Sequence, residues 1–216
     1  MVEKVLLSFD IGVTNMAYCC IDYDTKRILK WGCFSIKAKT LEAQTRKLIE
    51  HLDNLDFFSS LAEPITASLT PPLTVVIEKQ PRINARMRVL EGCLLMYFCL
   101  ANGKGADKVV TYSPHYKLKL YEPINDEPPL NFKLSLKSHY GRKKLGIEHC
   151  RRFLKRYEGV NDAAIGTEGS AEGSESVVEG SVSPWITYFE SCSKKDDLAD
   201  SYLQGLSYLN KHNGKH

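Results

Sequence analysis

The apolar positions of the chain form two runs that each end in a carboxylate. The first run ends at Asp10, two residues before Gly12, and the second, residues 73–78, ends at Glu78. Continuous apolar runs of this length are typical of strands buried on both faces of a sheet. Parallel neighbours would bring both acids to the carboxyl edge, where open α/β sheets place their sites. Gly12 would then let a phosphate or a metal-bound group approach closely; the alternative is an ordinary strand whose acid starts a turn.

Three more stretches are rich in strand-forming residues. They cover residues 16–22, 27–36 and 108–113. The turn-forming residues 23–26 join the first two, so the first three strands of the chain are expected to form an antiparallel meander.

Helical spacing of apolar positions predicts four helices. They cover residues 40–53, 84–101, 138–157 and 193 to about 211. One side of the first helix is formed by Leu41, Thr45, Leu48, Ile49 and Leu52. The last helix has an apolar face formed by Leu198, Tyr202, Leu206 and Leu209. The second helix is nearly all apolar after its first turns, so its far end is expected to be buried; residues 89–101 suit either the core or a dimer interface.

Two segments depart from these patterns. Residues 115–136 are rich in Pro, Lys and Tyr and are interpreted as an irregular insertion without a predicted structure. Residues 159–183 consist mainly of Gly, Ser, Glu, Ala and Val and predict a flexible acidic loop. The chain of 216 residues, 1–216, is expected to form a single domain with these two insertions.

The charge of the chain is unevenly distributed. The net charge is +3, but residues 159–183 contain five acids and neither Lys nor Arg, so removing them leaves +8 on the rest. A body this basic favours a polyanionic partner. With 43% hydrophobic and 25% charged residues, the composition is otherwise that of an ordinary globular protein.

The cysteines, the start of the sequence and the length of its apolar runs indicate the cellular compartment. The seven cysteines are scattered without a CxxC pair, which favours small buried hydrophobes in a reducing compartment. Because the apolar run of the first strand begins within a few residues of Met1, we expect no signal or transit peptide. Residues 89–101 are too short to span a bilayer. We expect an intracellular chain that is not in a membrane, in the host cytoplasm or nucleus if it is viral rather than in a mitochondrion.

Basic residues are concentrated at the start of the second helix and along the third. Residues 133–156 contain nine Lys or Arg and a single acid, Glu148. The candidate DNA contacts are Arg82, Arg86, Arg88, Lys137, Arg142, Lys143, Lys144, Arg151 and Arg152. A solvated helix face is the alternative interpretation.

Three acids open the last helix. Ser193 and Asp196 have the spacing of a capping box, which leaves open whether Asp196 is a cap or a ligand. Asp197 and Asp200 are spaced i, i+3 and share a helix face, so they can converge on one ion. The alternative is that all three acids only complement the helix dipole.

Asp10, Glu78, Asp197 and Asp200 together form a set of hard oxygen donors. Such a set suits two Mg²⁺ ions, with Mn²⁺ as a substitute, and requires no organic cofactor. Two ions about 3.5–4 Å apart can activate a water and stabilise the leaving 3′ oxygen of a phosphodiester. The sequence therefore predicts metal-dependent hydrolysis of a nucleic-acid strand.

Four phrases of the sequence resemble a known family. They are SFDIGVTN, VVIEKQPR, SHYGRKKLGIEHC and KKDDLADS. In this order, spanning residue 5 to about 210, they resemble the poxvirus-type Holliday junction resolvases and their mitochondrial fungal relatives, in the RuvC-like branch of the RNase H superfold. The resemblance implies an α/β fold with an RNase H-like mixed five-stranded sheet, an antiparallel meander followed by parallel strands, flanked by helices. It also implies a homodimer that cuts four-way DNA junctions by paired symmetric incisions.

The resemblance assigns roles to individual residues. It implies that the metal ligands are Asp10 on the first strand, Glu78 on the second carboxylate-ending strand, and Asp197 and Asp200 on the last helix. It further implies that Lys143 or Lys144 lies near the scissile phosphate, where its charge stabilises the transition state. The segments 115–136 and 159–183 depart from the compact pattern of the family.

Three other functions are considered. The motif DIGxTN is also found at the phosphate-binding start of sugar kinases and actin-like ATPases, but no second Gly-rich phosphate loop follows. A broader RNase H-like nuclease acting on RNA–DNA hybrids, flaps or other branched DNA shares the metal chemistry and is not separated by the sequence. A junction-binding protein without catalysis is disfavoured because all four acids are present.

Overall fold

The computed structural model describes residues 4–55, 72–100, 106–119, 138–157 and 184–213. The strands are β1 (Val5–Ile11), β2 (Asn15–Asp22), β3 (Ile28–Ser35), β4 (Leu73–Glu78) and β5 (Lys108–Tyr112). The helices are α1 (Leu41–Asn54), α2 (Ala85–Leu100), the 3₁₀ helix η1 (Pro114–Lys119), α4 (His139–Arg156), α6 (Pro184–Ser191) and α7 (Lys195–Asn213). All five predicted strands and four predicted helices are present, whereas α6 and η1 were not predicted.

The five strands form one mixed sheet in the order β3-β2-β1-β4-β5. The first three strands pair antiparallel, and β1, β4 and β5 pair parallel. The predicted meander followed by parallel strands is thereby confirmed. Phe9 on β1 lies opposite Ile77 on β4, so the next residues, Asp10 and Glu78, leave neighbouring strands at the same edge.

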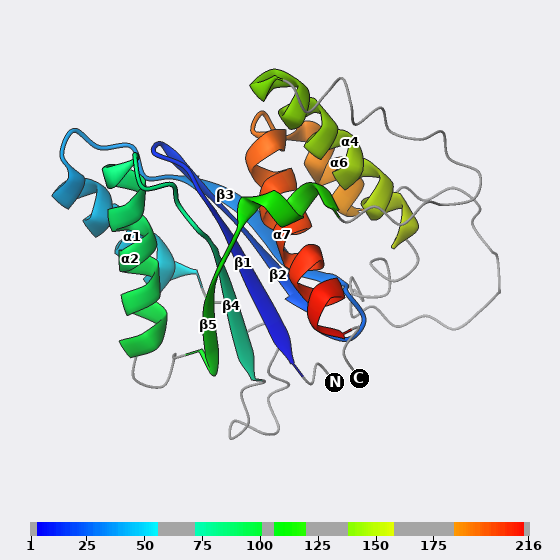
Figure 1. Cartoon of the computed structure of the whole chain (residues 1–216), viewed down its shortest axis with the longest axis horizontal. Coiled ribbons are helices and arrows are strands. Elements are labelled where there is room, and N and C mark those ends of the chain that lie inside the picture. The colour runs from blue at the N-terminus through cyan, green and yellow to red at the C-terminus, as the bar shows by residue number, and fades with distance from the viewer. Residues whose placement is uncertain (1–3, 56–71, 101–105, 120–137, 158–183, 214–216) are drawn as a thin grey trace, which may run out of the picture.

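Helices cover both faces of the sheet. Figure 1 shows α1 and α2 on one face and α4, α6 and α7 on the other. Leu7 and Phe9 of β1 pack into the core under α1 and α2, whereas Leu6 packs into the core under α7. Because strand side chains alternate between faces, Ser8 and Asp10 lie on the α7 face together with Leu6.

The helix α7 lies close against the middle of the sheet. A Cβ added to Gly205 would lie 2.7 Å from Ile21 Cδ1, 3.1 Å from Leu6 Cδ2 and 3.3 Å from Ser8 Cβ. The predicted apolar face of this helix is fully buried, from Leu198 to Leu209. The absence of a side chain at Gly205 is what allows this close approach.

The outer helices are less buried than predicted. In α1 the buried residues are Gln44, Leu48 and Leu52. The other members of the predicted apolar side, Leu41, Thr45 and Ile49, instead line an open groove toward α2. The expectation of a buried far end for α2 is confirmed on one side only: Phe98 is 2% exposed, whereas Met96 is 58% and Leu100 65% exposed. Only one side of α2 faces the sheet, and an apolar composition cannot indicate which residues the neighbours cover.

All seven cysteines lie in the described residues and carry free thiols. Cys19, Cys20 and Cys150 are buried as interpreted, but Cys99 is exposed on α2, so that interpretation is wrong there. In the described residues, no helix combines a bilayer-spanning length with sufficient apolarity. The predicted acidic loop, residues 159–183, and most of the segment 115–136 lie outside the described residues, and the extent of the single domain stays a prediction.

Candidate active site

Three carboxylates from three different elements surround the ammonium of Lys117. Its Nζ lies 2.7 Å from Oδ1 of Asp10 on β1, 3.3 Å from Oε1 of Glu78 on β4 and 3.3 Å from Oδ2 of Asp200 on α7. Lys117 belongs to η1 and is only 3% exposed. Four segments that are distant in the sequence therefore meet at one point. We call Asp10, Glu78, Asp197, Asp200 and Lys117 the acid site.

The position of α7 is fixed by hydrogen bonds beside this point. The side-chain amide of Gln204 is buried, and its Nε2 donates to Ser8 Oγ at 3.1 Å and to the Phe9 carbonyl at 2.9 Å. Residues four apart share a helix face, so Asp200 lies one turn before Gln204 on the same side. This turn places Asp200 at the level of Asp10, the residue that follows Phe9. The same amide also donates to a carbonyl of β4, so one side chain ties α7 to both acid-bearing strands.

Asp197 adds a fourth acid within electrostatic reach. Burial raises its pKa to about 6, and the charges of Asp196 and Asp10 act in the same direction. Burial likewise raises the pKa of Asp10 to about 7, against the lowering effect of the Lys117 charge. Crowded carboxylates removed from water favour protonation unless a cation compensates them. The acid site is therefore short of positive charge.

The pKa of Lys117 is lowered by burial and raised by the neighbouring carboxylates. Burial lowers its pKa, but the charges of Asp10, Asp200 and Glu78 outweigh burial and hold the pKa well above its ordinary value. Lys117 is therefore charged throughout the physiological pH range. A buried lysine is rare unless it is paired, and here three carboxylates pair with it.

Lys117 was not predicted from the sequence. It lies in the segment 115–136, for which no structure was predicted, because Pro and Tyr interrupt any periodicity there. In the structure Tyr116 packs against the core under α7, which directs the next side chain to the acid site. The proximity of the segment to the end of β5 was the available signal, since β5 runs parallel to β4 and ends at the same edge.

A second pair lies at the rim of the acid site. The ammonium of Lys143 on α4 donates a short hydrogen bond to Asp196. Burial raises the pKa of Asp196, but the hydrogen bond and charge of Lys143 outweigh it and hold the pKa below its ordinary value. The predicted capping box is wrong: α7 begins at Lys195, and the Lys194 carbonyl accepts its first hydrogen bond, so Ser193 is not the cap.

The structure places Lys143 beside the acid site. The hydrogen bond to Asp196 is the largest cause that raises the pKa of Lys143, and the charges of Asp197 and Asp200 add to it. Its neighbour Lys144 is exposed on α4. Both residues remain predicted contacts of the scissile phosphate, and of the two, Lys143 has the described contact with the acids.

The remaining predicted DNA contacts differ in their surroundings. The exposed ones are Arg82, Arg88 and Arg142, while Lys137 lies outside the described residues. Arg86 is half-buried and donates to Gln44 Oε1 at 2.7 Å, so it also connects α2 to α1. Arg151 pairs with Glu190 and Glu148, and Arg152 pairs with Glu148 at 3.5 Å. Arg86, Arg151 and Arg152 therefore have structural partners in addition to their predicted role.

The glycine after the first strand has a local explanation. A Cβ on Gly12 would lie 2.5 Å from the carbonyl oxygen of Asn15, across the turn between β1 and β2. No side chain fits in this turn, so glycine is required there whether or not a ligand approaches the strand. The predicted role of Gly12 in ligand approach stays a prediction.

The chemistry of the acid site fits a hard metal ion. Oxygen donors from Asp10, Glu78 and Asp200 already converge on one cationic atom, and such donors are the ligands that Mg²⁺ and Mn²⁺ prefer. The carboxylate oxygens are spaced to pair with an ammonium group. Among the described residues, no three His, Cys, Asp or Glu are placed as ligands of one metal ion. The donor set is thus suitable for a metal, and the side chains must close around it.

Comparisons with known proteins find similarity among solved structures. No family model and no curated protein matches this sequence. Among solved structures, RuvC of T. thermophilus in complex with a Holliday junction substrate is similar, with a TM-score of 0.40 and 11% sequence identity. The match covers 98% of this chain and 97% of that one.

Proposed function

We propose that this chain is a metal-dependent endonuclease that resolves four-way DNA junctions. The observation that carries the proposal is the convergence of Asp10, Glu78 and Asp200 on Lys117, with Asp197 beside them. Acids that distant in sequence have no shared structural reason to gather at a buried sheet edge. Perturbed titratable groups that cluster in this way are typical of functional sites.

The residues of the site would divide the work as follows. Asp10, Glu78, Asp197 and Asp200 would hold Mg²⁺ or Mn²⁺, which supplies an activated water and Lewis-acid stabilisation of the leaving oxygen. Lys143 lies on α4 next to these acids, and it would contact the phosphate and offset its developing charge. The exposed bases of α4 and of the start of α2 would position the DNA backbone.

The resemblance of the four sequence phrases to poxvirus-type and mitochondrial junction resolvases supports the choice of substrate. Three of the phrases contain the acids of the site, and the remaining one, SHYGRKKLGIEHC, contains Lys143 of α4. A viral or organellar role in processing recombination and replication intermediates belongs to the same proposal. An RNase H-like nuclease acting on flaps or RNA–DNA hybrids is the alternative, because the acid site is common to both.

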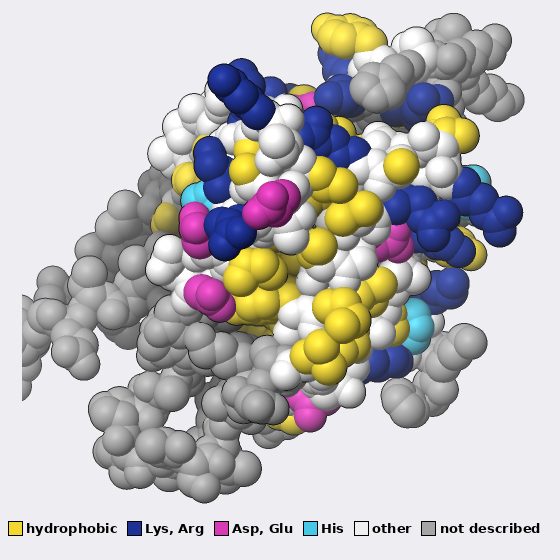
Figure 2. Space-filling model, turned by 90° about the vertical axis from the view of Figure 1, so that its left-hand side faces the viewer, with side chains coloured by type: hydrophobic (Ala, Val, Ile, Leu, Met, Phe, Trp, Pro, Cys, Tyr) yellow, Lys and Arg dark blue, Asp and Glu magenta, His cyan; other side chains and the backbone are white. Residues whose placement is uncertain are grey.

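A homodimer is part of the proposal, and α2 is its candidate interface. Figure 2 shows hydrophobic side chains gathered on the face formed by α1 and α2. On α2, the exposed hydrophobic residues are Val89, Met96 and Leu100, which are 42%, 58% and 65% exposed. Apolar patches of this kind on a helix indicate an interaction surface.

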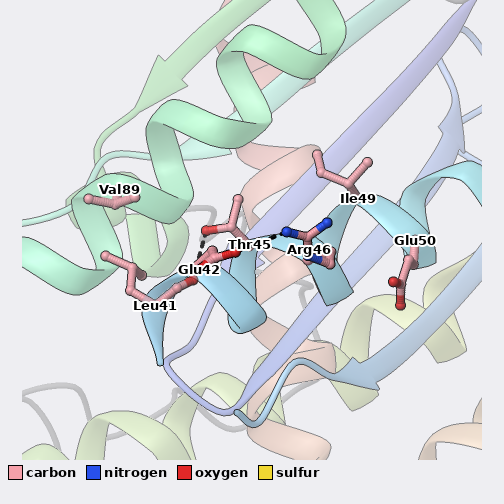
Figure 3. A pocket seen from close by; sticks show the side chains of 7 residues that line it. All are labelled: Leu41, Glu42, Thr45, Arg46, Ile49, Glu50 and Val89. Carbon is pink, nitrogen blue, oxygen red and sulfur yellow. Dashed lines mark hydrogen bonds and ion pairs between the residues drawn. The ribbon is translucent and has the colours of Figure 1, made fainter. Parts of the chain in front are cut away.

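A groove between α1 and α2 extends this face. It has a volume of about 590 Å³, and Figure 3 shows Val89 opposite Leu41, Thr45 and Ile49 across it. Acidic and basic side chains of α1 lie along its margin. Because a two-fold axis pairs each patch with its own copy, adjacent charges of both signs allow self-complementary contacts. A two-fold dimer also matches a junction that must be cut in two strands.

The proposed activity can be tested with matched substrates. The chain is incubated with a four-way junction, a flap, a linear duplex and an RNA–DNA hybrid of the same sequence, with Mg²⁺ or with EDTA. We expect paired cuts in the junction that require Mg²⁺. Preferred cutting of the hybrid or the flap would select the alternative function, and cutting in EDTA would contradict the metal requirement.

Site variants test the assignment of the acids. Glu78→Gln and Asp197→Asn should reduce junction cutting by about 100-fold or more, because each removes an ionic ligand. Junction binding, measured by fluorescence anisotropy in EDTA, should be retained because the basic surface is unchanged. Asp24→Asn is the control, since Asp24 is an exposed acid in the turn between β2 and β3. Retained cutting by either site variant would refute the assignment.

A further inference from the structure

The position of Lys117 has a consequence for the metal-free state of the protein. Its ammonium is within 3.3 Å of carboxylates on β1, β4 and α7. Lys143, in contrast, is exposed at the rim and pairs with Asp196. Lys117 is therefore placed as the shared counter-charge of the acid site, and Lys143 is not.

Without a counter-charge the acid site would oppose folding. Asp10 and Glu78 leave adjacent strands at the same level, so their charges are held together by the sheet register itself. Buried like charges repel each other strongly because little water screens them. The ammonium from η1 offsets this repulsion and also fixes η1 against the sheet edge and α7.

A divalent ion and the ammonium require the same oxygens. The Nζ–O distances are 2.7–3.3 Å, whereas Mg²⁺ binds oxygen at about 2.0–2.1 Å. The carboxylates cannot satisfy both distances at one point, so an ion at this point must displace the ammonium. The buried ammonium compensates part of the negative charge, and the remainder still attracts an ion of higher charge.

We propose that Lys117 is a tethered cation that holds the acid site together when no metal is bound, and that a divalent ion binds by taking the same carboxylate oxygens from it. This inference rests on the proposed function, because it takes the acids to be metal ligands. Lys117 on η1 would thus compete with the metal ion for the carboxylates. The acid site would stay folded without metal, and metal binding would be weaker because the ion must displace the lysine.

The test measures stability and metal binding without DNA. Lys117→Met removes the charge and keeps most of the side-chain volume, and Lys37→Met removes an exposed lysine as the control. In EDTA the midpoint of thermal unfolding of Lys117→Met should fall by roughly 10 °C, because the largely buried carboxylates of Asp10 and Glu78 lose their partner. Mn²⁺ should reverse most of this loss. Calorimetric titration should show that Mn²⁺ binds Lys117→Met about tenfold more tightly than the wild type.

The outcomes separate this inference from the proposed function. If Mn²⁺ binds neither protein, both the proposed function and this inference fail. If Mn²⁺ binds both with equal affinity, or the midpoint in EDTA is unchanged, only this inference is overturned. Should Lys117→Met not fold even with Mn²⁺, the double variant Lys117→Met/Asp200→Asn decides. Recovery of folded protein supports the role of charge balance, and continued failure to fold overturns it.

Discussion

At the scale of single residues, His149 is a titratable group in the protein interior. It lies on α4, is 2% exposed, and packs near Phe153 with 6.4 Å between ring centroids. Burial is the main cause that lowers its pKa to about 4, and the nearby charge of Arg152 adds to this. In the unfolded chain its pKa returns to about 6.5. Between these two values the unfolded state binds a proton that the folded state does not.

This difference predicts a loss of stability in acid. Because the folded pKa is depressed, the free energy of unfolding should decrease as pH falls from about 6.5 to 4. We expect wild type to lose about 1–2 kcal/mol more between pH 7 and pH 5 than His149→Gln, which cannot titrate. Urea unfolding at both pH values measures the difference, and the carboxylates common to both proteins cancel. Parallel pH dependence of the two proteins would contradict the buried, neutral histidine.

At the scale of elements, two helix glycines should respond oppositely to the same substitution. Gly205 on α7 has sheet side chains within 3.3 Å of an added Cβ, whereas a Cβ at Gly92 on α2 meets nothing within 4 Å. Replacing glycine by alanine inside a helix stabilises it by up to about 1 kcal/mol when there is space. The packing cost of an extra methyl in a tight contact is about 1–3 kcal/mol.

We therefore expect Gly92→Ala to raise the free energy of unfolding and Gly205→Ala to lower it. Urea unfolding at neutral pH measures both. Displacement of α7 would also move Asp197 and Asp200 away from the strand acids, so Gly205→Ala should cut junctions more slowly than Gly92→Ala. If Gly205→Ala is as stable as Gly92→Ala, α7 is not held against the sheet as tightly as the structure indicates.

At the scale of the whole molecule, the proposed dimer depends on the apolar face of α2. Met96→Glu would place a charge in the centre of that face, which is costly in an interface core. We expect this variant to be a monomer by light scattering and to make single rather than paired cuts in a junction. Thr187→Glu is the control, because Thr187 is exposed on α6, across the sheet from α2 and outside the predicted DNA contacts. An unchanged mass for Met96→Glu would exclude α2 as the interface.

The arrangement of the sheet could be predicted from local pattern. Apolar runs ending at Asp10 and Glu78 indicated buried strands, and the structure pairs those strands in parallel with both acids at one edge. The spacing of Asp197 and Asp200 indicated one helix face. These features follow from side-chain periodicity, which acts over a few residues and is therefore readable in the sequence.

Contacts between distant segments were decided only by the tertiary structure. Nothing near Lys117 in the sequence identifies its three carboxylate partners, and the pairing of Lys143 with Asp196 required α4 and α7 to pack side by side. The exposure of Met96 likewise depends on what α2 leaves uncovered. The sequence thus determined which elements form and where the strand acids lie. Only the tertiary structure determined which charged residues pair with these acids, because ion pairs between distant segments leave no periodic pattern in the sequence.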